Sequence, residues 1–219
     1  MKNYVMMVLI AMRNESEKMR EIMLKNNVMN ALARFGKGTA TSEFLDLLGM
    51  ENKEKCVIYS TMTYQKSRIV LRDINEFNCI DRKHKAIVFT VPITSVGGET
   101  SLEKLFGKDK EEDERMEMND KHEVIIAIAN RGYVDLIMDA ARAAGARGGT
   151  VVHARGTGID QSEKFFGVTI GAEKEMIYIV TQKEEKAAIM KAIMEKAGSG
   201  TPAETIMFSV PTVDVVGLN

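Results

Sequence analysis

The chain has 219 residues, of which 30 are basic and 31 acidic, and 45% of all residues are hydrophobic. It contains no Trp and two cysteines, Cys56 and Cys79. These values exclude a wholly disordered chain and a disulfide scaffold, and with only three histidines a four-ligand structural zinc site is poorly supplied. Because so few cysteines suit a reducing compartment, we expect a cytoplasmic protein.

The longest apolar run lies close to the start of the chain, from Tyr4 to Met12. A membrane-spanning helix needs roughly 20 apolar residues, which this run does not reach. The run meets Arg13 directly, without the small residues of a signal-peptide cleavage site. We therefore predict a buried strand here and no membrane span.

Apolar residues recur with strand and helix spacing in the same order twice along the chain. In residues 1–98 we predict strands near 4–11, 28–35, 55–63 and 86–92, and helices near 15–26 and 66–78. Residues 99–121 are dense in charge, and we predict a linker there. In residues 122–219 we predict strands over 124–129, 150–154, 176–181 and 205–210, helices over 134–141 and 189–197, and a loop over 155–173.

The two halves also align with each other. Lys37-Gly38-Thr39 matches Arg155-Gly156-Thr157, and Phe89-Thr90-Val91-Pro92 matches Phe208-Ser209-Val210-Pro211. Several matches in one order at nearly constant spacing predict a tandem duplication, with repeat 1 over 1–98 and repeat 2 over 122–219. The parts differ in net charge, which is +5 for repeat 1, −4 for the linker and −2 for repeat 2.

The repeated β-α-β-β-α-β order predicts an α+β fold of two tandem ferredoxin-like repeats, each an antiparallel sheet with both helices on one face. The strands are apolar throughout, which indicates that both faces of each sheet are buried. The helices cover one face, so the sister repeat or a neighbouring chain must cover the other, and we expect an oligomer. We interpret both cysteines as small buried hydrophobes.

Three glycine-containing loops are candidate ligand sites. In Arg155-Gly156-Thr157-Gly158 a guanidinium stands beside glycines whose N–H groups can approach an anion, although a flexible hinge also explains these residues. Gly198-Ser199-Gly200-Thr201 offers N–H and hydroxyl donors, although glycine is also the usual residue at a helix C-terminus. Gly36-Lys37-Gly38-Thr39 is the counterpart of the first loop in repeat 1.

The second repeat resembles the end of the PII nitrogen-regulatory signalling family. There a short glycine loop, here 198–201, precedes a strand ending in proline, here 206–211, and an acidic-apolar segment follows, here 214–218. Residues 153–158 resemble the start of that family's long loop, as do residues 36–39 in repeat 1. The likeness covers nearly all of residues 122–219 and continues more weakly over 2–98.

The resemblance implies ferredoxin-like subunits packed as trimers, with a small molecule bound in clefts between subunits. In the family that molecule is usually an adenine nucleotide such as ATP or ADP, and the glycine loop and the base of the long loop line the cleft. The expected ligand-binding residues are therefore the three loops Gly36–Thr39, Arg155–Gly158 and Gly198–Thr201. The resemblance also implies a regulator of nitrogen utilisation, not an enzyme, that modulates a partner enzyme, transporter or regulator through the loops.

The sequence departs from the family pattern in two respects. Neither loop between the second and third strands contains Tyr, so the family's usual modification site has no counterpart. The lysine that neutralises phosphates after the glycine loop corresponds to Ile206 in repeat 2 and Ile87 in repeat 1. The identity of the ligand thus stays open between ATP or ADP, another nucleotide and a different anion.

A metal-binding trimer similar to the CutA family, which shares this fold, is the alternative. The sequence shows no set of His, Cys, Asp and Glu with metal-site spacing, and no arrangement typical of a catalytic site. Nucleic acid is not favoured as a partner, because a net charge of +5 over 98 residues is modest and no aromatic-basic strand motif accompanies it.

Overall fold

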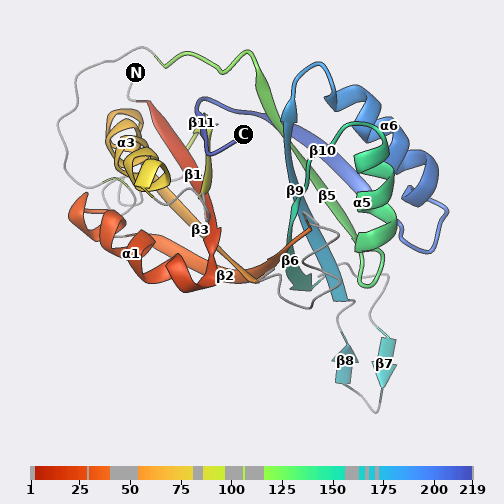
Figure 1. The fold of residues 1–219 in the computed structure, drawn as a ribbon. Helices are drawn as coiled ribbons and strands as arrows, with labels where there is room; N and C mark the ends of the chain where they lie inside the picture. The colour runs from red at the N-terminus through yellow and green to blue at the C-terminus, as the bar shows by residue number, and fades with distance from the viewer. Residues whose placement is uncertain are drawn as a thin grey trace. The chain divides into compact units, whose positions relative to one another are not determined.

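The computed structural model describes residues 3–28, 30–39, 54–80, 86–96, 106, 116–155, 163–165, 168–170 and 173–218. They belong to two compact units, whose elements are labelled in Figure 1. Unit 1 takes its residues from 1–35, 54–120 and 211–219, and unit 2 takes its residues from 36–53 and 121–210. Each unit therefore includes a short segment that is distant in sequence from its main part.

Unit 1 has the order β-α-β-β-α-β followed by a short terminal strand. Its elements are β1 (Tyr4–Met12), the 3-10 helix η1 (Arg13–Glu15), α1 (Ser16–Lys25), β2 (Ala31–Gly38), β3 (Glu54–Thr63), α3 (Tyr64–Ile80), β4 (Ile87–Ile93) and β11 (Val215–Val216). The strands lie in the order β2-β3-β1-β4-β11. β1 pairs antiparallel with both neighbours, with Leu9 opposite Ile58 and Val8 opposite Phe89.

The core of unit 1 lies between its sheet and α1 and α3, which Figure 1 shows on one side of the strands. The buried cluster includes Val5, Met7 and Leu9 of β1, Met19 and Met23 of α1, and Val70 and Ile74 of α3. The intervening β1 residues Val8 and Ile10 are buried as well, together with Val57 and Phe89. Both faces of these strands are therefore buried, as their apolar sequences indicate.

Part of the predicted linker contributes to unit 1. Phe106 is buried and stacks on Tyr4, with the ring centroids 3.8 Å apart. Met116 packs against the core cluster of unit 1. These two contacts were not predicted, because the high charge density of residues 99–121 gave no sign of a core contact.

Unit 2 has the same order of main elements, with a hairpin between its second and third main strands. Its elements are β5 (His122–Asn130), α5 (Val134–Ala143), β6 (Thr150–Arg155), β7 (Glu163–Phe165), β8 (Val168–Ile170), β9 (Glu173–Gln182), α6 (Lys186–Ala197) and β10 (Ile206–Pro211). The main strands lie in the order β10-β5-β9-β6, and residues 36–38 of β2 pair antiparallel with β6. β7 and β8 form a separate two-stranded sheet.

The core of unit 2 lies between this sheet and the two helices α5 and α6. The buried cluster includes Ile125 and Ala127 of β5, Ile137 and Met138 of α5, Ile177 and Ile179 of β9, and Ile189 and Ile193 of α6. Ile189, Ile193 and Ala197 are all fully buried, so the four-residue spacing correctly identified the inner face of α6.

The mixed α/β architecture with antiparallel pairing is confirmed. Three local predictions differ from the structure. β2 begins at Ala31 instead of near residue 28, because Asn27 has a left-handed backbone (φ 54°) and Val28 N–H donates to the Met23 carbonyl (2.9 Å). The predicted loop over 155–173 contains the β7–β8 hairpin, whose three-residue strands are too short to give a periodic signal. The terminal strand β11 has its partner, β4, in the other half of the chain.

The prediction that both cysteines are buried is correct for Cys56 and wrong for Cys79, which is exposed. Helix α3 turns Val70, Ile74 and Asn78 inward, and the side chain that follows Asn78 points away from that face. Among the helices of the described residues, none is both long and apolar enough to cross a membrane.

Candidate functional site

One end of the unit 2 sheet brings together the loop after α6, the end of β5, the start of β9 and the end of β6. The antiparallel register places Asn130 opposite Lys174, and Arg155 opposite Glu173. β9 runs between β5 and β6, so its first residues separate the two strand ends. We call this region the loop end of unit 2.

The glycine loop that follows α6 is closed by its own hydrogen bonds. Thr201 donates to the Gly198 carbonyl through both its N–H (3.1 Å) and its Oγ1 (2.8 Å), and Thr205 N–H donates to the Ala197 carbonyl (3.0 Å). A Cβ at position 198 would overlap the Met194 carbonyl oxygen, and Gly200 has a φ of 90°. Glycine is therefore required at 198 by close packing and favoured at 200 by backbone conformation.

Asn130 connects this loop to the sheet. Its backbone N–H donates to the Ala203 carbonyl (2.9 Å), and its side-chain Nδ2 donates to the Pro202 carbonyl (2.9 Å). The Lys174 ammonium donates in turn to Asn130 Oδ1 (2.6 Å). This one amide therefore fixes the glycine loop over the β5–β9 pair, a role that the sequence analysis did not find.

Charged side chains continue from Lys174 toward the end of β6. Arg131 donates to the carboxylate of Glu173. That hydrogen bond and the charge of Arg131 lower the pKa of Glu173, with further attraction from Arg155 and His153. Arg155 is exposed and lies opposite Glu173, so its guanidinium belongs to the same electrostatic group.

A buried carboxylate lies under this group. Glu175 is only 6% exposed, and its Oε2 accepts a hydrogen bond from Gly132 N–H (2.9 Å). Its Oε1 lies 3.4 Å from His153 Nδ1. Gly132 has a φ of 96°, which glycine adopts without strain, so the turn between β5 and α5 can present its N–H to the carboxylate.

The repeat 1 loop residues lie at the opposite end of β6. Gly38 pairs with Thr150, and the Thr39 N–H (2.9 Å) and Oγ1 (3.0 Å) both donate to the Gly149 carbonyl. A Cβ at Gly36 would overlap the Val151 carbonyl oxygen. In unit 2, residues 36–39 therefore act as a paired strand end, and Lys37 pairs with Val151 within it.

The predicted site residues thus divide into two groups. Arg155 and the loop Gly198–Thr201 lie at the loop end of unit 2, with Asn130 and Lys174 between them. Gly36–Thr39 lies at the other end of the sheet. Gly156, Thr157 and Gly158 fall outside the described residues.

The described part of the chain contains no group of three or more His, Cys, Asp or Glu side chains that could hold a metal ion. Glu173, Glu175 and His153 at the loop end have metal-ligating chemistry, but Glu173 is engaged by Arg131, and the remaining pair without a third ligand does not make a metal site. The described residues therefore give no observation in favour of the metal-binding alternative.

Comparison with known proteins gives a match over the second half of the chain. Residues 122–218 match the family model described as nitrogen regulatory protein P-II. Among solved structures, the chain is similar to Arabidopsis thaliana PII bound to citrate, with 25% identity and a TM-score of 0.34. That alignment covers 42% of this chain and 78% of the Arabidopsis chain. No curated protein matches.

Proposed function

Because residues 122–218 match the family model described as nitrogen regulatory protein P-II, we propose that the chain is a PII-like signalling protein that binds a small ligand and modulates a partner. The ligand is an adenine nucleotide or another small anion, and the protein is a regulator and not an enzyme. We also propose that residues 1–98 are a second, diverged copy of the same unit, because both units share the β-α-β-β-α-β order.

The observation that carries the proposal is the placement of Arg155 and the glycine loop at one end of one sheet. Both segments were selected from the sequence for anion-binding chemistry, and both lie at the loop end of unit 2. Asn130 and Lys174 connect the glycine loop to the start of β9 through hydrogen bonds, next to Glu173, which lies opposite Arg155. A ligand at this end would meet a guanidinium on one side and a preorganised glycine loop on the other.

The charges at the loop end favour a ligand with few negative charges. Arg131, Arg155 and Lys174 supply three positive charges, and Glu173, Glu175 and Glu204 of the loop after α6 supply three negative ones. These charges balance, and because the Arg131 guanidinium is already engaged by Glu173, the positive groups that face a ligand are Arg155 and Lys174. We therefore propose that a monophosphate or a bicarbonate ion binds more tightly here than a triphosphate.

Association of chains is also part of the proposal, with a trimer favoured. Met207 of β10 packs against the helix-side core, so its neighbours Ile206 and Phe208 point to the other face of the sheet. They are 62% and 48% exposed, and two large apolar side chains side by side on an outer strand are typical of an interface. The partner protein would be contacted through the segment between β6 and β9, which carries the β7–β8 hairpin.

Isothermal titration with AMP, ADP, ATP, cyclic AMP and bicarbonate tests ligand binding. We expect at least one of these to bind the purified oligomer, and Arg155→Gln to weaken that binding about three- to tenfold, because one charge-assisted contact is lost. Lys191→Gln is the matched control, since Lys191 is an exposed cation on α6 whose neighbour is Glu195 on the same helix. The absence of binding at millimolar concentrations, with the oligomer intact, would contradict the proposal.

A further inference from the structure

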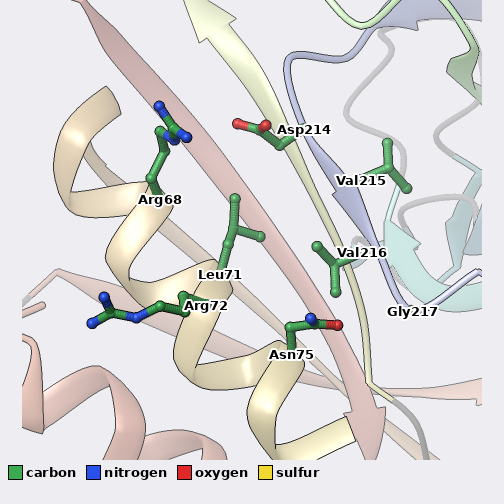
Figure 2. A pocket seen from close by; sticks show the side chains of 8 residues that line it. All are labelled: Arg68, Leu71, Arg72, Asn75, Asp214, Val215, Val216 and Gly217. Carbon is green, nitrogen blue, oxygen red and sulfur yellow. The ribbon is translucent and has the colours of Figure 1, made fainter. Parts of the chain in front are cut away.

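A groove of about 490 Å³ lies in unit 1 between α3 and the C-terminal segment. Its lining includes Arg68, Arg72 and Asn75 from the helix, and Asp214, Val216 and Gly217 from the C-terminal segment (Figure 2). This volume is within the range of about 300–1,000 Å³ that is typical of small-molecule pockets. The groove is separate from the loop end of unit 2, because both of its walls belong to unit 1.

The C-terminal wall is held in a fixed conformation by β4. Val213 N–H donates to the Thr90 carbonyl (2.8 Å), and Thr90 N–H donates to the Asp214 carbonyl (3.0 Å). Asp214 N–H donates to Thr90 Oγ1 (3.0 Å), and Val213 is buried in the core of unit 1. The backbone that carries the Asp214 carboxylate is therefore preorganised.

The two walls are joined at Ala86. Asn78 of α3 donates from Nδ2 to the Ala86 carbonyl (2.8 Å) and accepts from Ala86 N–H at Oδ1 (2.8 Å). On the other side Gly217, with a φ of 88°, packs so closely that a Cβ would overlap the same carbonyl oxygen. Val70 and Ile74 hold α3 in the core of unit 1. Both walls of the groove are therefore in place before a ligand binds.

The walls carry opposite charges. Figure 2 shows Arg68 extending from α3 on the side of Asp214, whose carboxylate points back toward the helix. Arg72 lies one helical turn farther along and is turned away from the C-terminal segment; its side chain is 69% exposed and lies 3.9 Å from the Asp73 carboxylate. The Asn75 side chain points from α3 into the space beside Val216.

We propose that this groove binds a small zwitterionic acid, with its carboxylate on Arg68 and its protonated amine on Asp214. A guanidinium matches a carboxylate in shape and charge, and a fixed carboxylate is the natural acceptor for an ammonium group. A ligand with acidic groups alone would gain the first contact and be repelled by Asp214. The groove therefore selects amino acids over dicarboxylic acids of the same size.

L-Aspartate and succinate are the matched probes, because they carry the same two carboxylates and differ by the amine. In titrations of the full chain we expect aspartate to bind about three- to tenfold more tightly than succinate. Asp214→Asn should abolish that preference, Asp214→Glu should retain it, and Arg68→Gln should weaken both ligands. Arg20→Gln is the control, because Arg20 is an exposed helical arginine of unit 1 that pairs with Glu17 on its own helix.

Equal affinity for the two probes, or a preference that survives Asp214→Asn in a folded protein, would overturn the proposal. So would the absence of saturation by either probe into the millimolar range. Circular dichroism establishes that each variant is folded. Arg155→Gln should leave aspartate binding unchanged, which separates this groove from the ligand site proposed in unit 2.

Discussion

Two glycines of the loop after α6 are required for different physical reasons. Gly198 is packed against the Met194 carbonyl oxygen, whereas Gly200 has open space around it and a left-handed φ of 90°. We expect Gly198→Ala to lower the free energy of unfolding by about 1–3 kcal/mol, because the backbone must shift, and Gly200→Ala to lower it by about 1 kcal/mol. Urea denaturation measures both values, and a larger loss for Gly200→Ala would contradict this assignment.

The ion pair between Glu123 and Lys186 predicts how stability depends on pH. Lys186 Nζ lies 2.8 Å from the Glu123 carboxylate, and this hydrogen bond lowers the pKa of Glu123 below its ordinary value of 4.5. A lowered pKa in the folded state stabilises the protein above pH 4.5, and that contribution disappears as the pH falls through the folded value.

Glu123→Gln should therefore be less stable than the unmodified protein near neutral pH, and the difference should shrink as the pH falls below 4.5. Denaturation series from pH 7 to pH 3 measure this convergence. Glu195→Gln is the control, because Glu195 lies on the exposed side of α6, 3.9 Å from Lys191. A difference for Glu123→Gln that stays constant over this range would show that its carboxylate does not stabilise the fold in this way.

At the scale of elements, the apolar periodicity predicted the main strands and helices, because the spacing of apolar residues within one segment is enough to predict that segment. It could not predict features that depend on distant residues. Asn130 fixes a loop 72 residues away, so a single Asn at a strand end gave no signal. Gly36 is required by the carbonyl of Val151, a contact that no local pattern contains. Arg155 and Gly198 could be named as candidate site residues from the sequence, because the pattern that points to each one lies within its own loop.

The C-terminal segment is an element of unit 1, and its removal tests that assignment. Val213 is 4% exposed in the core cluster, and Val216 packs against the same cluster. We expect Val213→Ala to destabilise unit 1 by about 1–3 kcal/mol, and Val215→Ala, outside that cluster, to cost less.

A chain that ends at Val210 should exchange the amide hydrogens of β4 faster, since Thr90 loses its partner at Asp214. Unchanged protection of Thr90 N–H would contradict the assignment.

At the scale of the whole molecule, the proposed assembly predicts a mass. Multi-angle light scattering of a trimer should give about three times the chain mass of 24.4 kDa. Phe208→Glu should lower that mass, because a charge replaces an apolar side chain that is half exposed on β10. Leu136→Glu, at an apolar residue of α5 that is 42% exposed, is the control for the added charge. A monomer mass for the unmodified chain would overturn the assembly.

Binding of a small anion at the loop end of unit 2 is tested most directly by a crystal structure of the protein with bound AMP. We expect density for the phosphate between the Arg155 guanidinium and the loop Gly198–Thr201, with Asn130 and Lys174 retaining their hydrogen bond. Density for AMP at another place on the chain, with the loop end vacant at saturating ligand, would contradict it.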